Sequence, residues 1–112
     1  MNIETEKRGE VTILRPVGRV DSATSGAFEQ AIVAAFDGGI RLMVLDFSRL
    51  EYISSAGLRS TLIAGKKARA LPEGQLVLCS LSPQVAEIFA ISGFNTIFTI
   101  CNNLDEALCR FS

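Results

Sequence analysis

Two adjacent serines, Ser54 and Ser55, are the residues of this sequence best placed to carry a chemical event. They precede a run from Ala56 to Ala70 that has the spacing of an amphipathic helix. The first turn of a helix carries unpaired N–H groups and a partial positive charge, so it can accept a phosphate or a phosphorylated side chain. Gly57 has no side chain to obstruct the backbone of a partner. The spacing therefore suits a serine that is switched by phosphorylation. On these four residues alone, however, ordinary helix capping is the favoured explanation.

The rest of the composition excludes most catalytic and metal chemistry. The chain has no histidine, which removes the commonest general base near neutral pH, the Ser-His-Asp and Cys-His arrangements and any histidine metal ligand. Its three cysteines, Cys79, Cys101 and Cys109, lie in or beside apolar stretches, which predicts buried free thiols. No phosphate-binding glycine loop occurs. We therefore expect no cofactor, no bound metal and no enzymatic activity.

Length and charge favour one domain that spans residues 1–112. The chain is 48% apolar, which is enough for a single core. Its 11 basic and 12 acidic residues leave a net charge of −1, which argues against direct binding of nucleic acid or anionic lipid. The longest unbroken apolar run, Ala31 to Phe36, has six residues, and the N-terminus has no apolar signal region. We therefore expect a cytoplasmic protein that does not insert into a membrane.

The elements that would position the serines begin with a β-hairpin. Residues 3–7 and 11–17 have strand-like patterns around a turn at Gly9, and Pro16 predicts a bulge or an unpaired stretch near the end of the second strand. Polar residues 21–24 precede apolar residues at three- and four-residue intervals, which predicts a capped helix that ends at Gly38-Gly39. Residues 42–47 form a short apolar run broken only by Asp46, as expected of a buried parallel strand.

The second half of the chain predicts further alternation of helices and strands. Residues 48–53 are predicted to be a loop before the helix of residues 56–70, and strands are predicted at 75–80 and 96–101. Ser82 and Pro83 fit the start of a third helix, and Asn103 with Glu106 resembles a capping box for a short last helix. This order predicts an α/β fold, with a mixed sheet of about five strands and about four helices. Functional residues would then lie in the polar segments 21–25 and 46–55, beyond the carboxyl ends of the strands.

Several motifs in order resemble the STAS family, which includes the bacterial anti-sigma factor antagonists. The clearest segment begins at Val44-Leu45-Asp46-Phe47-Ser48 and runs through Tyr52-Ile53-Ser54-Ser55-Ala56-Gly57-Leu58-Arg59. Further similarity lies at Gly18-Arg19-Val20-Asp21, Ser82-Pro83, Ser92-Gly93-Phe94 and Asp105-Glu106-Ala107-Leu108. The resemblance spans nearly the whole chain, and it implies a STAS-like sheet with an opening β-hairpin followed by βα units.

The resemblance implies that Ser55 is a phosphoacceptor. In the bacterial antagonists of this family, a serine at the start of the second helix is phosphorylated by an anti-sigma factor that is also a serine kinase, and Ser55 has that position. The family's commonest motif there is Asp-Ser-Ser-Gly or Asp-Ser-Thr-Gly. This chain departs from it twice. Ser54 replaces the acidic residue, and this change bears on recognition by the kinase or the phosphatase. Ala56 removes the hydroxyl after the acceptor, so Ser54 is the only nearby residue that competes with Ser55 as the phosphoacceptor.

The same resemblance implies a binding switch. The unphosphorylated protein, expected to be a monomer when free, would bind an anti-sigma factor serine kinase and displace the sigma factor that the kinase holds. A phosphate on Ser55 adds a charge of about −1.5 to −2 at neutral pH and would end this binding. A metal-dependent serine phosphatase would restore it. A second interpretation, which the non-acidic Ser54 keeps open, is an accessory STAS subunit of a membrane ABC transporter ATPase complex.

Neighbouring residues are expected to support the switch. By analogy with the family, Asp21 and Asp46 would lie near Ser55 at one edge of the sheet and orient the serine or repel its phosphate. Helix capping and loop hydrogen bonding explain Asp21 at least as well. Ser22 belongs to the same polar segment, and Arg59, one turn beyond Ser55, is the best candidate to contact an acidic partner. Three other basic residues of this helix either steer that partner or form a solvated face: Lys66, Lys67 and Arg69.

Overall fold

Six strands and four α-helices alternate along residues 1–111, which the computed structural model describes. The strands are β1 (Asn2–Arg8), β2 (Val11–Val20), β3 (Leu42–Asp46), β4 (Leu50–Ile53), β5 (Gln75–Cys79) and β6 (Thr99–Cys101). The helices are α1 (Ser25–Asp37), α2 (Ser55–Ala70), α3 (Pro83–Ile91) and α4 (Leu104–Cys109), with a short 3-10 helix at Phe94–Thr96. The predicted α/β fold with an opening hairpin is confirmed.

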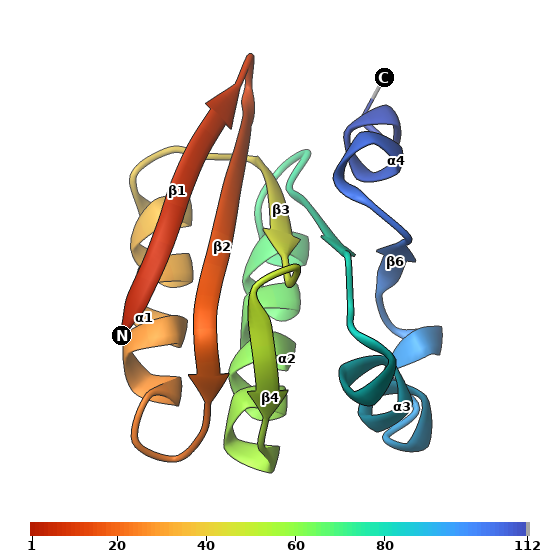
Figure 1. The fold of residues 1–112 in the computed structure, drawn as a ribbon. Helices are drawn as coiled ribbons and strands as arrows, with labels where there is room; N and C mark the ends of the chain where they lie inside the picture. The colour runs from red at the N-terminus through yellow and green to blue at the C-terminus, as the bar shows by residue number, and fades with distance from the viewer. Residues whose placement is uncertain (112) are drawn as a thin grey trace.

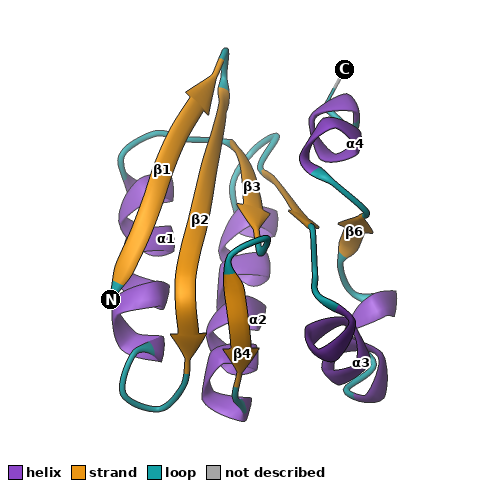
Figure 2. Cartoon of the chain, in the orientation of Figure 1, coloured by secondary structure: helices purple, strands orange, loops and turns teal. Residues whose placement is uncertain are grey.

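A mixed sheet forms the centre of the molecule (Figure 1). Its strand order is β1-β2-β3-β5-β6, and β4 lies off this path and pairs with the end of β2. The β1–β2 pair is antiparallel, whereas the four other pairs within residues 1–111 are parallel. Parallel neighbours need long crossover connections, which α1 and α2 supply along one face of the sheet (Figure 2). No helix within residues 1–111 combines the length and the apolar character that a membrane crossing requires.

Two apolar clusters lie on the two faces of the sheet. The larger cluster packs α1, α2 and α3 against one face and contains five buried phenylalanines: Phe28, Phe36, Phe47, Phe89 and Phe98. The smaller cluster lies beneath α4 on the other face. Adjacent residues of β3 divide between them, because Met43 and Leu45 join the larger cluster and Val44 joins the smaller one. This division follows from the two-residue period of a strand.

The prediction of a loop over residues 48–53 is wrong, because residues 50–53 form β4. This strand pairs in parallel with Gly18, Arg19 and Val20 at the end of β2. Its first and last residues, Leu50 and Ile53, are buried and anchor it to the larger cluster. β4 therefore fixes the chain directly before Ser54.

Three smaller expectations also need correction. Pro16 lies in the uninterrupted β1–β2 register, and the irregularity occurs instead between Gly18 and Arg19 in the pairing with β4. The last strand begins at Thr99, not at residue 96, because residues 94–96 form the 3-10 helix. Cys79 and Cys101 are buried as predicted, but Cys109 is exposed at the end of α4.

Candidate functional site

Ser55 is the first residue of α2, and its side chain is exposed. The residue before it, Ser54, caps the helix: the Ser54 Oγ accepts a hydrogen bond from the Gly57 N–H at 3.3 Å. The Ser54 N–H in turn donates to the Val20 carbonyl at 2.8 Å, which ties the start of α2 to the end of β2. The capping explanation therefore applies to Ser54, and it leaves the Ser55 hydroxyl free of a capping role.

Gly57 is buried, so the prediction that a partner's backbone approaches it is wrong. A Cβ atom built on Gly57 would lie 2.6 Å from the Cγ1 of Ile53 and 2.8 Å from the Cγ1 of Val20. The missing side chain therefore serves internal packing, because it lets the first turn of α2 approach the ends of β2 and β4. Ala56, beside it, is half-buried.

Asp21 orders the loop between β2 and α1. Its Oδ1 accepts hydrogen bonds from the N–H of Ala23 at 3.0 Å and from the N–H of Thr24 at 3.2 Å. The bond from Ala23, with smaller contributions from Thr24 and Arg19, lowers the pKa of Asp21 below its ordinary value. These contacts agree with the loop-hydrogen-bonding explanation. Ser22, the next residue, is exposed.

Asp46 does not take the expected position, because its carboxylate is buried on the face of the sheet opposite α2. Its Oδ2 lies 2.8 Å from the Nε of Arg15, and its Oδ1 accepts a hydrogen bond from the Ser48 N–H at 3.0 Å. Like Val44 two residues earlier, it points away from the helices α1 and α2. Burial opposes ionisation, but Arg15 and Ser48 outweigh it, so the pKa of Asp46 is lowered. Asp46 therefore orders the sheet and the β3–β4 turn, and it does not orient Ser55.

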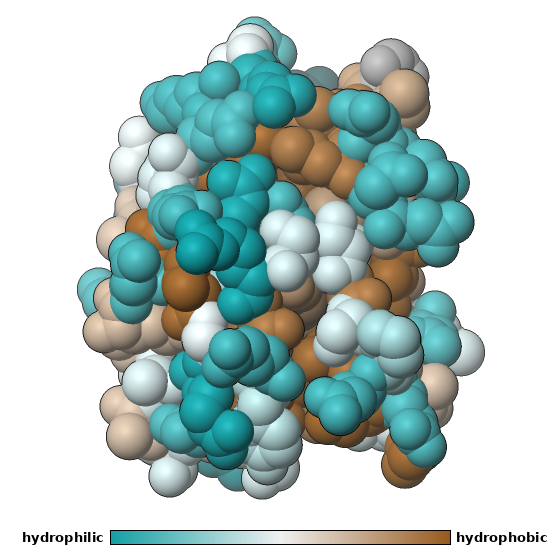
Figure 3. All heavy atoms as spheres, viewed as in Figure 1, coloured by the Kyte–Doolittle hydropathy of each residue, from teal (hydrophilic) through white to brown (hydrophobic). Residues whose placement is uncertain are grey.

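A network of charges surrounds Arg15 on this face of the sheet. The Arg15 guanidinium also lies 3.6 Å from Glu4 and 3.5 Å from Glu6, both on β1. Glu4 pairs with Arg49 at 2.6 Å. Hydrophilic side chains accordingly gather over β1 and β2 in Figure 3. The network joins three strands and the β3–β4 turn through one half-buried arginine.

Two residues that sequence reasoning did not assign lie beside the serines. Arg19 and Tyr52 are paired across the β2–β4 ladder, and the Arg19 guanidinium lies 4.4 Å from the centre of the Tyr52 ring. Both residues are exposed, and Tyr52 as a whole keeps 37% of its surface accessible. Nothing in the sequence indicated this pair, because it depends on β4 being a strand.

A shallow groove runs between the first turns of α1 and α2. Its volume is about 440 Å³, and it is lined by Ser25, Gly26, Glu29, Ser55, Ala56, Arg59 and Ser60. The structure thus brings together three of the predicted residues, Ser55, Ala56 and Arg59. Glu29 is a further lining residue that the sequence did not single out, and its Oε1 lies 3.3 Å from the Ser60 hydroxyl. The groove is thus an open surface lined by one exposed hydroxyl, one cation and one carboxylate.

The sheet, its helices and the exposed serine at the start of α2 together define the class of protein. The family model described as STAS domain matches residues 2–107, and the chain belongs to the STAS domain family. Over 111 residues it is 42% identical to BtrV of Bordetella bronchiseptica, provisionally described as an anti-sigma factor antagonist. The match covers 99% of this chain and 95% of BtrV.

Solved structures share the architecture. A crystal structure of an anti-sigma factor antagonist from Mycobacterium paratuberculosis superposes with a TM-score of 0.90 at 25% identity, over 97% of this chain and 92% of that one. The Bacillus cell fate determinant SpoIIAA in its phosphorylated form has a TM-score of 0.75 at 23% identity, over 99% of this chain and all of that one. The second likeness concerns the fold alone.

Proposed function

We propose that this protein is an anti-sigma factor antagonist, a cytoplasmic regulatory protein of one domain that acts by binding and not by catalysis. The proposal draws on the full-length similarity to BtrV and on the similarity to the Mycobacterium protein. The observation that carries the mechanism is the exposed Ser55 hydroxyl at the first position of α2, next to the capping Ser54. A hydroxyl in this place accepts a phosphoryl group without disturbing the helix.

In this proposal, unmodified Ser55 lies within the surface that binds an anti-sigma factor serine kinase. Binding displaces the sigma factor, and the kinase supplies the nucleotide, the magnesium and the catalytic base for transfer of a phosphoryl group to Ser55. Arg59 and the exposed Arg19–Tyr52 pair flank the same edge and suit contact with an acidic partner. A metal-dependent serine phosphatase removes the phosphate and returns the protein, a monomer when free, to its binding form.

Phosphorylation acts through charge. The phosphate brings a charge of about −1.5 to −2 to the groove that Glu29 already lines. The complex with the kinase must then either remove water from a dianion near a carboxylate or dissociate. A penalty of about 3 kcal/mol lowers affinity about a hundredfold. The positive end of α2 can hold the phosphate locally, so the switch requires no rearrangement of the sheet.

The test is a kinase assay with matched serine variants. The purified protein is incubated with ATP, magnesium and its cognate kinase, and any phosphate is located by mass spectrometry. We expect modification of wild type and of Ser54→Ala, and none of Ser55→Ala. Ser55→Asp should remain folded and lose kinase binding. Equal modification of Ser55→Ala and wild type would contradict the site, and recovery of an ABC-type ATPase without a kinase from native lysate would favour the accessory-subunit function.

A further inference from the structure

The groove at Ser55 is lined by a cation that has no ionic partner. Seven residues line it, and only Arg59 and Glu29 among them carry a charge. Neither residue takes part in any of the seven ion pairs within residues 1–111. Arg59 is exposed, so its guanidinium group is accessible to an anion that arrives in the groove.

Ser55 and Arg59 lie one turn apart on the same face of α2. Residues at positions i and i+4 of a helix have Cβ atoms about 5–6 Å apart, and an anion that precedes a cation is the favourable order. The guanidinium group presents its N–H groups as a planar fork that matches two oxygens of a phosphate. A phosphate on Ser55 can therefore accept hydrogen bonds from Arg59 without any movement of the helix backbone.

Glu29 lines the same groove from α1 and has a fixed position. The Ser60 hydroxyl lies 3.3 Å from the Glu29 Oε1 and 3.2 Å from the Ser25 carbonyl oxygen, so both can share its proton. Ser60 is only 3% exposed, and this contact ties the carboxylate to the wall of the groove. A phosphate on Ser55 is therefore repelled by Glu29 and attracted by Arg59.

The other charged groups at this edge of the sheet are already in contact with one another. The Nε of Arg19 lies 3.9 Å from the Oδ2 of Asp21, and the Arg19 guanidinium also covers the Tyr52 ring. Asp21 in turn accepts hydrogen bonds from the N–H groups of its own loop. This cation and this anion therefore largely compensate each other.

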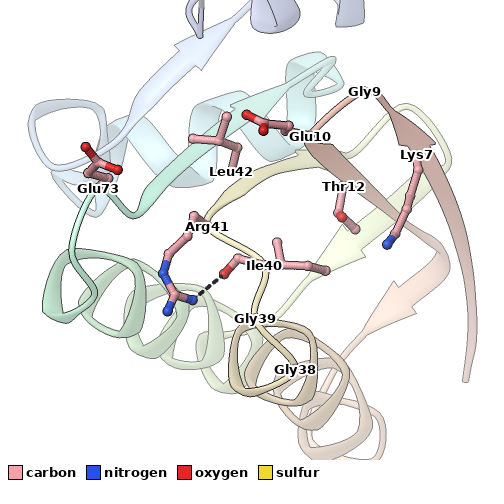
Figure 4. A pocket seen from close by; sticks show the side chains of 10 residues that line it. All are labelled: Lys7, Gly9, Glu10, Thr12, Gly38, Gly39, Ile40, Arg41, Leu42 and Glu73. Carbon is pink, nitrogen blue, oxygen red and sulfur yellow. Dashed lines mark hydrogen bonds between the residues drawn. The ribbon is translucent and has the colours of Figure 1, made fainter.

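More distant cations cannot replace Arg59. Lys66, the next basic residue of α2, is eleven positions beyond Ser55, which is about 16 Å along the helix axis and about twice the Debye length at physiological salt. Lys7 and Arg41 line a separate cavity of about 520 Å³ at the other end of the sheet. Figure 4 shows that they lie on opposite sides of Ile40 and do not converge on one point.

We propose that phosphorylated Ser55 forms an ion pair with Arg59 of the same molecule, so that one modification also withdraws the cation that the unmodified surface offers to its partner. This inference rests on the proposed function and deepens it. The phosphate adds negative charge to the surface, and at the same time the guanidinium turns from the partner to the phosphate. Both changes weaken the contact with an acidic partner, and both take place within one turn of α2.

The test measures how strongly Arg59 stabilises the dianionic phosphate. Phosphoserine is incorporated genetically at position 55 of the full-length protein, so that no kinase is required, and the phosphate is titrated by ³¹P NMR. Its second pKa is ordinarily about 6. Arg59→Gln removes a stabilising cation and should raise this pKa by about 0.5 relative to the wild-type sequence, whereas Glu29→Gln removes a repelling carboxylate and should lower it by about 0.3. Lys66→Gln, which removes an exposed cation of the same helix, should leave it unchanged.

A second measurement follows Arg59 directly. In the ¹⁵N-labelled protein, the Nε–Hε resonance of Arg59 should move when Ser55 carries the phosphate, and that of Arg69 near the end of α2 should not. An unchanged phosphate pKa in Arg59→Gln, an equal change in Lys66→Gln, or an unmoved Arg59 resonance would overturn the ion pair. None of these results depends on a kinase, so they are distinct from a failure of the kinase to modify Ser55, which would contradict the proposed function itself.

Discussion

Replacing Gly57 by alanine tests how closely the start of α2 packs on the sheet. The new Cβ would lie 2.6 Å from Ile53, 2.8 Å from the Val20 side chain and 3.0 Å from the Val20 carbonyl oxygen. Rotamer changes can move the two side chains, but the carbonyl belongs to the backbone of β2. Overpacking of this kind costs about 1–3 kcal/mol, and the better helix propensity of alanine returns up to about 1 kcal/mol. We therefore expect a net loss of about 1–2 kcal/mol.

Thermal unfolding with a second glycine variant as control measures this loss. For a chain of this size, the expected loss lowers the Tm by about 4–8 °C. Gly26→Ala makes the same change in α1, where a Cβ would meet nothing within 4 Å, and it should leave the Tm unchanged or raise it slightly. A Gly57→Ala protein that unfolds at the wild-type temperature or above would show that α2 has room at this position, and the packing argument would then fail.

Three further predictions follow from single contacts. Ser54→Ala removes the cap of α2 and should lower the free energy of unfolding by about 1 kcal/mol in denaturant titrations, with no loss expected if the cap contributes nothing. The native pKa of Asp46 lies below its ordinary value of 3.8, so its pairing with Arg15 stabilises the fold above that pH and is lost as the pH falls through the native pKa. Asp46→Asn should therefore be less stable than wild type at pH 7, and the difference should shrink as the pH falls below 3.8 through the lowered native pKa; a difference that stays constant would contradict this. Burial raises the pKa of Cys79 to about 11, so iodoacetamide at pH 8 should label the exposed Cys109 and reach Cys79 only after unfolding, as peptide mapping would show.

Local patterns predicted the caps of α2, α3 and α4 because their causes are local, whereas the predicted cap of α1 is wrong: Thr24 precedes that helix and makes no side-chain cap hydrogen bond. Ser82 accepts a hydrogen bond from the Val85 N–H, with Pro83 at the first helical position, and Asn103 accepts one from the Glu106 N–H. Each cap lies within three residues of its donor, so the sequence alone shows it. The exposed position of Ser55 at a helix start was predictable for the same reason.

The missed features depend on contacts between distant segments. β4 has four residues, of which only Leu50 and Ile53 are buried, so no alternation marks it as a strand. It exists because β2 continues past the hairpin and offers residues 18–20 as a partner. Asp46 likewise meets Arg15, which is 31 residues earlier in the chain. Neither the ladder nor the ion pair has a signal in the neighbouring sequence.

The charges of β1 have a consequence for self-association. β1 is the first strand of the sheet and, among residues 1–111, pairs only with β2, so its outer edge offers free backbone groups to another extended chain. Its Glu4 and Glu6 carboxylates pair with Arg49, Arg15 and Arg8, which places partly exposed ions on the face of the strand that forms this edge. Lateral addition of a strand, the route to aggregates, would have to strip these ions of water. The same ions that join the hairpin to the sheet therefore also help to keep the protein dispersed.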